Sequence, residues 1–448
     1  MTARKDFLQS LTLGKKSEPT AEYAPSLRSP WRASDVLQFS DDKIKFSRVF
    51  DSILPRSTKQ QQDWTLISPV VLANAIRIGV RGMAEVCDLN LSALLTAENA
   101  YVRMETLTQA VHLINIAIEK LEIFKHNNID GKHHASLDGL KLGTRIQNIA
   151  ARHSPKFLGK DAGVSAYNVI FNYLSLASRL ISSNEYEGNF TFEVMHHQNT
   201  QAFKLERAST DRHGMNPLNF ALFDLTDLLY APRIPKPHNE MLWGMGYHAE
   251  YNDMIIRPDK MINKNYIIHD WDNMQRMLVS ILTGEAIPSI VIGKMSSGNY
   301  RSKTKLAFTH YNHIVRSEFI LRYLDSKLFR HAIECALNRG EAYNNLYRAI
   351  TLLNGGKFRG QSEAEMMIWD QCSRLVAAVI LYYNTYILNH LYLNGKTQEE
   401  KDLLIVLSPG AWVHINMLGY YEFCGIESSQ FVDQCLARWD WQQSLKNG

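Results

Sequence analysis

Three acidic residues occupy positions where carboxylates could support metal-dependent chemistry: Asp138 in HASLDGL, Asp211 in STDRHG and Glu341 in LNRGEAYNNL. Two hard cations such as Mg²⁺, held about 3.5 to 4 Å apart, need carboxylate oxygens from separate elements and open positions for phosphate and water. Two Asp on neighbouring strands and one Glu on a helix beside them would meet that need. Such a centre could orient water or a 3′-hydroxyl for attack on a phosphodiester.

Each of these acids also has an ordinary structural explanation. The Asp138 segment is typical of a turn, Asp211 could cap the helix that follows it, and Glu341 could be a solvated residue near the positive end of a helix dipole. Short motifs give many false matches, so the residues alone favour these structural explanations. Convergence of the three side chains in one site would reverse that preference.

Several basic residues could contact phosphate. Arg212 fits a phosphate contact or a solvated charge better than a catalyst, while His213 could contact the scissile phosphate, steady the metal site or bond a loop carbonyl. The segment GKMSSGNYRSKTK is a further candidate for DNA contact, although a charge run is usually a solvated loop. Its basic residues are Lys294, Arg301, Lys303 and Lys305.

Composition narrows the class of protein. The 448 residues carry 49 Lys and Arg against 45 Asp and Glu, a formal charge of +4, which falls short of the basic balance of an isolated nucleic-acid-binding module. The apolar content of 45% and the 5 cysteines exclude a disordered chain and a disulfide scaffold. The longest apolar stretch, 375–383, is shorter than a membrane span, and no signal-peptide core is present. We expect a soluble cytoplasmic protein.

Periodicity divides the chain into four parts. We expect a flexible leader over 1–35, a helical region over 36–130, a mixed α/β region over 131–356 and a second helical region over 357–448. The first helical region should hold amphipathic helices over 72–87 and 107–121.

The α/β region has a pattern of its own. Paired strands are expected over 166–180. Around Asp211 we expect a strand in the polar segment 207–217, a helix over 218–230 and a short strand over 231–235. Residues 235–305 are expected to be an irregular insertion, because Pro, Asn and Gly interrupt every periodic run, and to end in an exposed cationic loop.

Six ordered blocks between about 66 and 423 carry a family resemblance. They are ASLDG with Lys141-Leu142 after it, SPKFLG, STDRHG leading to APRI, SEFILRYLDS, LNRGEAYNNLYRAI and LSPGAWVHINMLGYYEF. With these blocks the sequence resembles the large replicative transposases of the Tn3 family. The resemblance implies an RNase H-like DDE catalytic domain over 131–356, with an insertion before its catalytic helix. It also implies that Asp138, Asp211 and Glu341 bind two Mg²⁺ (or Mn²⁺) ions.

The resemblance further implies a function. A transposase of this family would cut DNA at the transposon ends and join the exposed 3′-hydroxyls to target DNA, giving a cointegrate. Its partners would be double-stranded DNA and a second copy or a full-length transposase, in the bacterial cytoplasm at the nucleoid, with no membrane. Family members carry a long amino-terminal region for end recognition, so we expect this chain to be a truncated, carboxy-terminal part.

Two other interpretations stay open. One is a catalytically silent, DNA-binding transposase remnant that interferes with the full-length enzyme. The other, which sets the resemblance aside, is a helical scaffold with an unrelated α/β insert.

Overall fold

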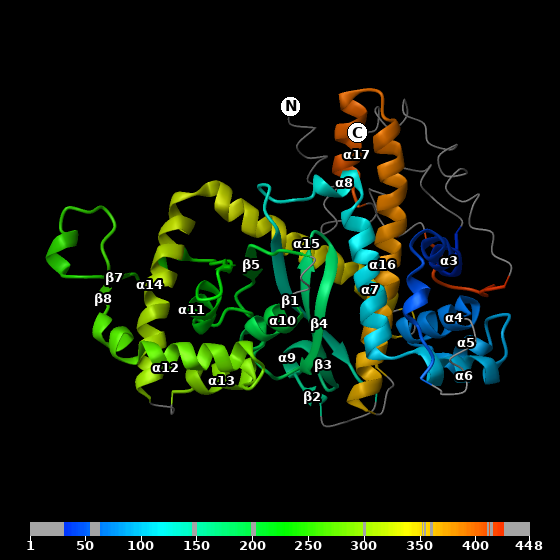
Figure 1. The fold of residues 1–448 in the computed structure, drawn as a ribbon, viewed down its shortest axis with the longest axis horizontal. Helices are drawn as coiled ribbons and strands as arrows, with labels where there is room; N and C mark the ends of the chain where they lie inside the picture. Colours follow the sequence, from blue (N-terminus) through cyan, green and yellow to red (C-terminus); the bar gives the residue numbers. More distant parts are fainter. Residues whose placement is uncertain are drawn as a thin grey trace.

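The computed structural model describes residues 31–53, 63–145, 150–198, 203–298, 302–351, 353, 355–358, 362–409, 412 and 415–424. Within these residues a mixed β-sheet lies in the middle of the molecule. Helices from both ends of the chain lie on one side of it, and helices from the central segment lie on the other (Figure 1). The fold class is therefore mixed α/β, as predicted.

The sheet places the two aspartates at neighbouring positions. Its strands are β1 (His134–Gly143), β2 (Arg152–His153), β3 (Ala162–Phe171), β4 (Leu174–Ser182), β5 (Arg207–Thr210) and β6 (Leu229–Tyr230). They follow the order β4-β3-β1-β5-β6, with β2 paired to the start of β3. The strands β4, β3 and β1 are antiparallel, while β1, β5 and β6 run parallel. The β1–β5 register ends with Leu137 opposite Thr210, immediately before Asp138 and Asp211.

The predicted strand pair is confirmed. Every residue of β3 is buried, as its run of Val, Ile, Tyr and Phe predicts, and β4 returns antiparallel to it. Asn172 and Tyr173 form the turn, with φ angles of 46° and 73°. Positive φ at both central residues matches the right-handed twist of a two-residue hairpin. The first strand and the helix after it are confirmed as β5 and α11 (Leu218–Asp224), although α11 is shorter than expected. The second strand is wrong in position: β6 lies inside the expected helix and 231–235 holds no strand, because the backbone turns at Asp227 (φ 57°) and ends the helical run early.

The amino-terminal helices pack around one long helix near the other end of the chain. They are α3 (Ala33–Ile44), η2 (Phe46–Val49), α4 (Trp64–Ala75), α5 (Gly79–Ala84), α6 (Leu91–Tyr101), α7 (Met104–Glu119) and α8 (Glu122–Lys125). The long helix α16 (Glu363–Asn394) runs beside α7 and is followed by α17 (Gln398–Leu407) (Figure 1). Helix α3 begins at Ala33, inside the expected leader, and that residue is buried. The rest of the leader, 1–30, lies outside the described residues.

One of the two predicted amphipathic helices is confirmed and the other is wrong. Helix α7 covers most of 107–121. The helix expected over 72–87 is divided into α4 and α5, because the backbone turns between them at Arg77 (φ 64°) and Gly79 (φ 72°). A left-handed φ ends a right-handed helix whatever the spacing of its apolar residues.

The insertion is helical where an irregular segment was expected. It contains η4 (Pro237–Asn239), β7 (Trp243–Gly244), η5 (His248–Tyr251), β8 (Lys260–Met261), α12 (Lys264–Leu282) and α13 (Pro288–Ser296). The expectation failed because residues interpreted as helix breakers begin helices. The Asn263 side chain accepts the Asn265 N–H at 3.1 Å as an N-cap, and Pro288 is the first residue of α13.

The expected cationic loop is also mostly helical. Lys294 lies in α13, while Lys303 and Lys305 lie in the first turn of α14 (Lys303–Asp325). Arg301 lies outside the described residues. None of the described helices combines the length and the apolar character needed to cross a membrane.

The helix α15 (Lys327–Thr351) follows α14 and packs directly on β1. A Cβ added at Gly340 would lie 2.7 Å from Ser136 Oγ of β1, closer than a real Cβ tolerates. Glycine at 340 therefore allows the helix that carries Glu341 to approach the strand that carries Asp138.

We expect Gly340→Ala to lower the free energy of unfolding by up to about 1–3 kcal/mol, because either α15 moves away from β1 or the buried Ser136 hydroxyl must rotate out of the way. Gly293→Ala in α13 is the matched control, since its Cβ would lie 3.6 Å from Asn189 Nδ2, an ordinary contact. That control should be neutral, or more stable by up to about 1 kcal/mol from helix propensity. Denaturant unfolding measures both variants, and equal stability would contradict the close approach.

Candidate active site

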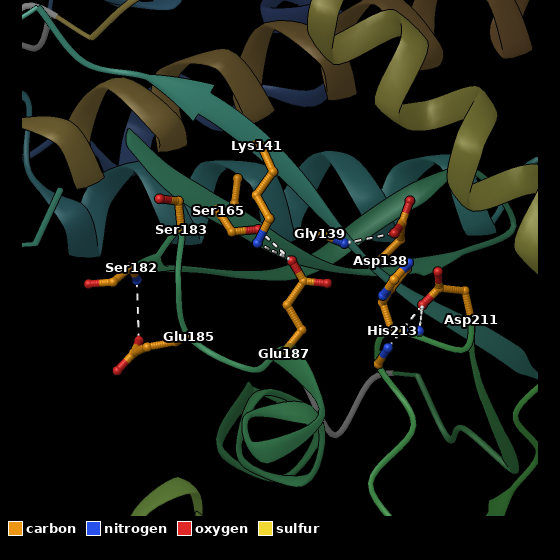
Figure 2. Close-up of polar contacts among 12 residues, drawn as sticks. Asp138, Gly139, Lys141, Ser165, Ser182, Ser183, Glu185, Glu187, Asp211 and His213 are labelled. Atoms are coloured by element: carbon orange, nitrogen blue, oxygen red, sulfur yellow. Dashed lines mark hydrogen bonds and ion pairs between the residues drawn. The ribbon is translucent and has the colours of Figure 1, made fainter. Parts of the chain in front are cut away.

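Asp138 and Asp211 lie at neighbouring positions on the parallel strand pair. Asp138 is inside β1, and Asp211 directly follows β5. Figure 2 shows the two carboxyl groups beside each other, each with backbone donors. Asp138 Oδ1 accepts the Gly139 N–H at 2.9 Å, and Asp211 Oδ1 accepts the N–H groups of His213 and Gly214, both at 2.9 Å. The backbone thus fixes the direction of both side chains.

Glu341 enters this region from α15. It is exposed and directly follows Gly340, the residue at which the helix contacts β1. Its charge acts on Asp138, as does the charge of Asp211. The structure therefore brings Asp211 and Glu341 each within electrostatic reach of Asp138, a relation between distant segments that the sequence alone could not establish.

The pKa of Asp138 reflects the acids that surround it. Burial, the largest cause, and the negative charges of Asp211, Glu187 and Glu341 together raise the pKa of Asp138 from 3.8 to about 7, although the Gly139 N–H lowers it. Each cause that raises the pKa disfavours a negative charge that a bound cation would stabilise. Ionisation of Asp138 therefore adds a negative charge that the surrounding residues do not compensate.

Sequence analysis missed a fourth carboxylate, that of Glu187 in η3 (Glu187–Asn189). Its Oε1 atom lies 2.7 Å from Lys141 Nζ and accepts a hydrogen bond from Ser165 Oγ at 2.9 Å (Figure 2). The carboxylate lies directly over Gly139, where a Cβ would be 2.1 Å from Oε1. Glu187 lies on a three-residue helical turn with no periodicity or motif, so no sequence signal indicated it.

Asn344 is a second residue that sequence analysis missed. Its Nδ2 atom donates to Asp138 Oδ2 at 2.9 Å from the interior of α15. The sequence did contain a signal for Asn344. It lies three residues after Glu341, and residues three apart on a helix share one face.

The donor set suits a hard divalent cation. Its carboxylates come from a strand, from the residue after a second strand and from a helix, and oxygen is the ligand that Mg²⁺ prefers. Among the residues that the structure describes, no three His, Cys, Asp or Glu side chains are grouped closely enough to hold a metal ion. A cation bound here would therefore require the carboxylates to turn toward it.

The predicted basic residues occupy different surroundings. Arg212 and His213 are exposed beside Asp211, and the His213 ring lies 6.5 Å from that of Phe157. Lys294 is exposed and lines a cavity of about 560 Å³ between β4, η3 and α13. Lys305 Nζ donates to the Ser297 carbonyl at 2.6 Å and so connects α14 to the end of α13, while Lys303 is exposed at the start of α14.

Comparison with known proteins gives a consistent result. A family model described as Tn3 transposase DDE domain matches residues 35–421. The chain is 28% identical to the transposase for transposon Tn3926 of Escherichia coli over 415 residues, and 26% identical to that for Tn501 of Pseudomonas aeruginosa over 417 residues. Both matches cover 90% of this chain and 40% of the relative. The chain thus spans about two fifths of the length of these relatives.

The raised pKa of Asp138 predicts how stability depends on pH. The folded, metal-free protein keeps a proton on Asp138 up to about pH 7, whereas the unfolded chain loses it near 3.8. Protonation of Asp138 therefore stabilises the folded protein. This stabilisation is fully present below pH 3.8 and is lost as the pH rises through about 7, a loss of at most about 4 kcal/mol in the free energy of unfolding. We expect the stability difference between wild type and Asp138→Asn to fall across that window in urea unfolding with a chelator. A difference that is constant with pH would contradict it.

The buried Lys141–Glu187 ion pair predicts that replacing Lys141 destabilises the protein more than replacing a lysine of a surface ion pair. Lys141→Met leaves the buried Glu187 carboxylate without its cation, which should cost about 3 kcal/mol. Lys132→Met is the control, because Lys132 pairs with Glu206 at 2.9 Å on the surface and should cost less than about 1 kcal/mol. Thermal and denaturant unfolding measure both variants, and similar losses would show that the inner pair is not buried as described.

Proposed function

We propose that this chain, which belongs to the Tn3 transposase DDE domain family, is a DNA transposase whose reactive centre is formed by Asp138, Asp211 and Glu341. The observation that carries the proposal is the surroundings of Asp138, where burial together with the charges of Asp211, Glu187 and Glu341 raises the pKa of this carboxyl to about 7. A structural cap or turn would not need two further acids beside it.

Members of the DDE family generally use divalent metal ions. Asp138, Asp211 and Glu341 would hold two Mg²⁺ or Mn²⁺ ions, which when bound activate water or a 3′-hydroxyl and stabilise the leaving oxygen. The backbone donors of Gly139, His213 and Gly214 would keep both aspartates directed at the reacting phosphate. Convergence of groups from three elements gives the orientation that in-line displacement needs.

The finer parts of the proposal have separate support. An RNase H-like core is supported by the sheet, in which three antiparallel strands continue into two parallel ones with helices on both faces. Contact with double-stranded DNA at transposon ends and target is supported by the exposed Arg212 and His213 beside Asp211 and by the exposed Lys294. Replicative, cointegrate-forming strand transfer is supported by the sequence blocks shared with replicative transposases. The domain boundaries, pairing with a second copy and a place at the nucleoid stay predictions.

A nicking and strand-transfer assay tests the proposal. With Mg²⁺ or Mn²⁺ and DNA carrying transposon ends, we expect Asp138→Ala and Glu341→Ala to lose at least about 10³-fold in rate, because each removes a metal ligand. The control is Glu334→Ala, an exposed acid on the same helix as Glu341, which should keep wild-type activity.

Unchanged activity in either ligand variant would refute the assignment. DNA binding without cleavage under any divalent ion, together with suppression of transposition by a full-length relative, would instead favour the silent, interfering alternative.

A further inference from the structure

Helix α15 presents two functional groups to Asp138. Glu341 supplies a carboxylate, and Asn344, one turn later, donates from Nδ2 to Asp138 Oδ2 at 2.9 Å. The other oxygen of Asp138, Oδ1, accepts the Gly139 N–H. Both oxygens of Asp138 therefore have a fixed donor. One of these donors belongs to the same rigid helix as the third acid.

A second amide, that of Asn168, lies behind the first. Asn168 lies opposite Asp138 in the β1–β3 register, and its Nδ2 atom is 3.5 Å from Asn344 Oδ1. When Asp138 is ionised its carboxylate can only accept hydrogen bonds, so the NH₂ group of Asn344 faces Asp138 and its oxygen faces Asn168. The two amides thus form a directed chain, Asn168 to Asn344 to Asp138, that crosses from β3 through α15 to β1.

Packing alone does not account for this chain. Asn168 is fully buried and Asn344 is 4% exposed. Asn168 Oδ1 and Ser136 Oγ, the atom that Gly340 faces, have no hydrogen-bond partner among the described residues. Buried polar groups that are only partly satisfied stabilise a core less than apolar side chains of the same size would. A polar chain retained in this position is better explained by what it does to Asp138.

We propose that Asn344, oriented by Asn168, is a positioning residue that holds the Asp138 carboxylate and the Glu341 helix in one arrangement for the divalent cation. This inference rests on the proposed function, since it concerns the same site. Asn344 acts through Asp138 and need not touch DNA or the cation itself. Partners of this kind, which orient a metal ligand, typically change metal affinity or activity by 10- to 100-fold when removed.

The test is Mn²⁺ binding to the full, metal-free chain, measured by calorimetry without DNA, together with the melting temperature in chelator. We expect Asn344→Ala to bind Mn²⁺ at least about tenfold more weakly than wild type. Asn345→Ala, the next residue on the same helix, is the matched control and should bind like wild type. A purely structural role would lower the melting temperature of Asn344→Ala and leave its Mn²⁺ affinity unchanged, and that result would overturn the inference.

A second variant keeps the test decisive if Asn344→Ala does not fold. Asn168→Ala removes the amide that faces Asn344 and leaves Asn344 and Asp138 in place, so weaker Mn²⁺ binding by this variant would support the inference and wild-type binding would overturn it. Wild-type protein that binds Mn²⁺ no better than Asp138→Asn would refute the proposed metal site itself. Failure of the proposed function is thereby distinguished from failure of the positioning role.

Discussion

The negative charges of Asp211, Glu187 and Glu341 oppose ionisation of Asp138, and this repulsion is the constraint on which the rest of the site depends. Asp138 lies at the centre of the group, and its pKa rises to about 7 through burial and the charges of Asp211, Glu187 and Glu341. One cation, Lys141, lies 2.7 Å from the Glu187 carboxylate. The surrounding backbone and side-chain donors hold these acids together in the absence of metal, so the fold stabilises an arrangement that is unfavourable by itself.

The strand and the helix that carry Asp138 and Glu341 are each held by contacts on more than one side. Strand β1 is paired on both sides, with β3 and β5, and cannot shift without breaking two ladders. Helix α15 is fixed on it by the close approach at Gly340 and continues to Tyr347, which donates to the buried Asp370 of α16 at 2.6 Å. The helix that carries Glu341 is therefore fixed both at the sheet and at the core of the helical layer.

Much of this was predictable from the sequence, and the failures have identifiable causes. The hairpin of β3 and β4 and the helix α7 follow from local periodicity, which packing leaves intact. The failed helix over 72–87 depends on the backbone at Arg77, whose left-handed φ does not change the apolar spacing. Asn263 and Pro288 were interpreted as breakers although the same residue types begin helices, and only the following turn distinguishes the two uses.

The site was predictable to the extent that it lies in recognisable blocks. The three acids could be proposed from their motifs, but their convergence required the strand register. Glu187 could not be proposed, because it reaches Asp138 through the packing of a short turn over Gly139 and not through any pattern along the chain. Asn344 could have been proposed from its place three residues after Glu341 on a helix.

The wide separation of the acids along the chain has a consequence for when the site can exist. Asp138 and Asp211 are 211 − 138 = 73 residues apart, and Glu341 follows 341 − 211 = 130 residues later. Contacts between such distant segments form late, because the closure of long loops must precede them. A nascent or partly folded chain therefore lacks the assembled acids. The three acids can come together only once the insertion has been made and α15, which follows it, has docked on β1.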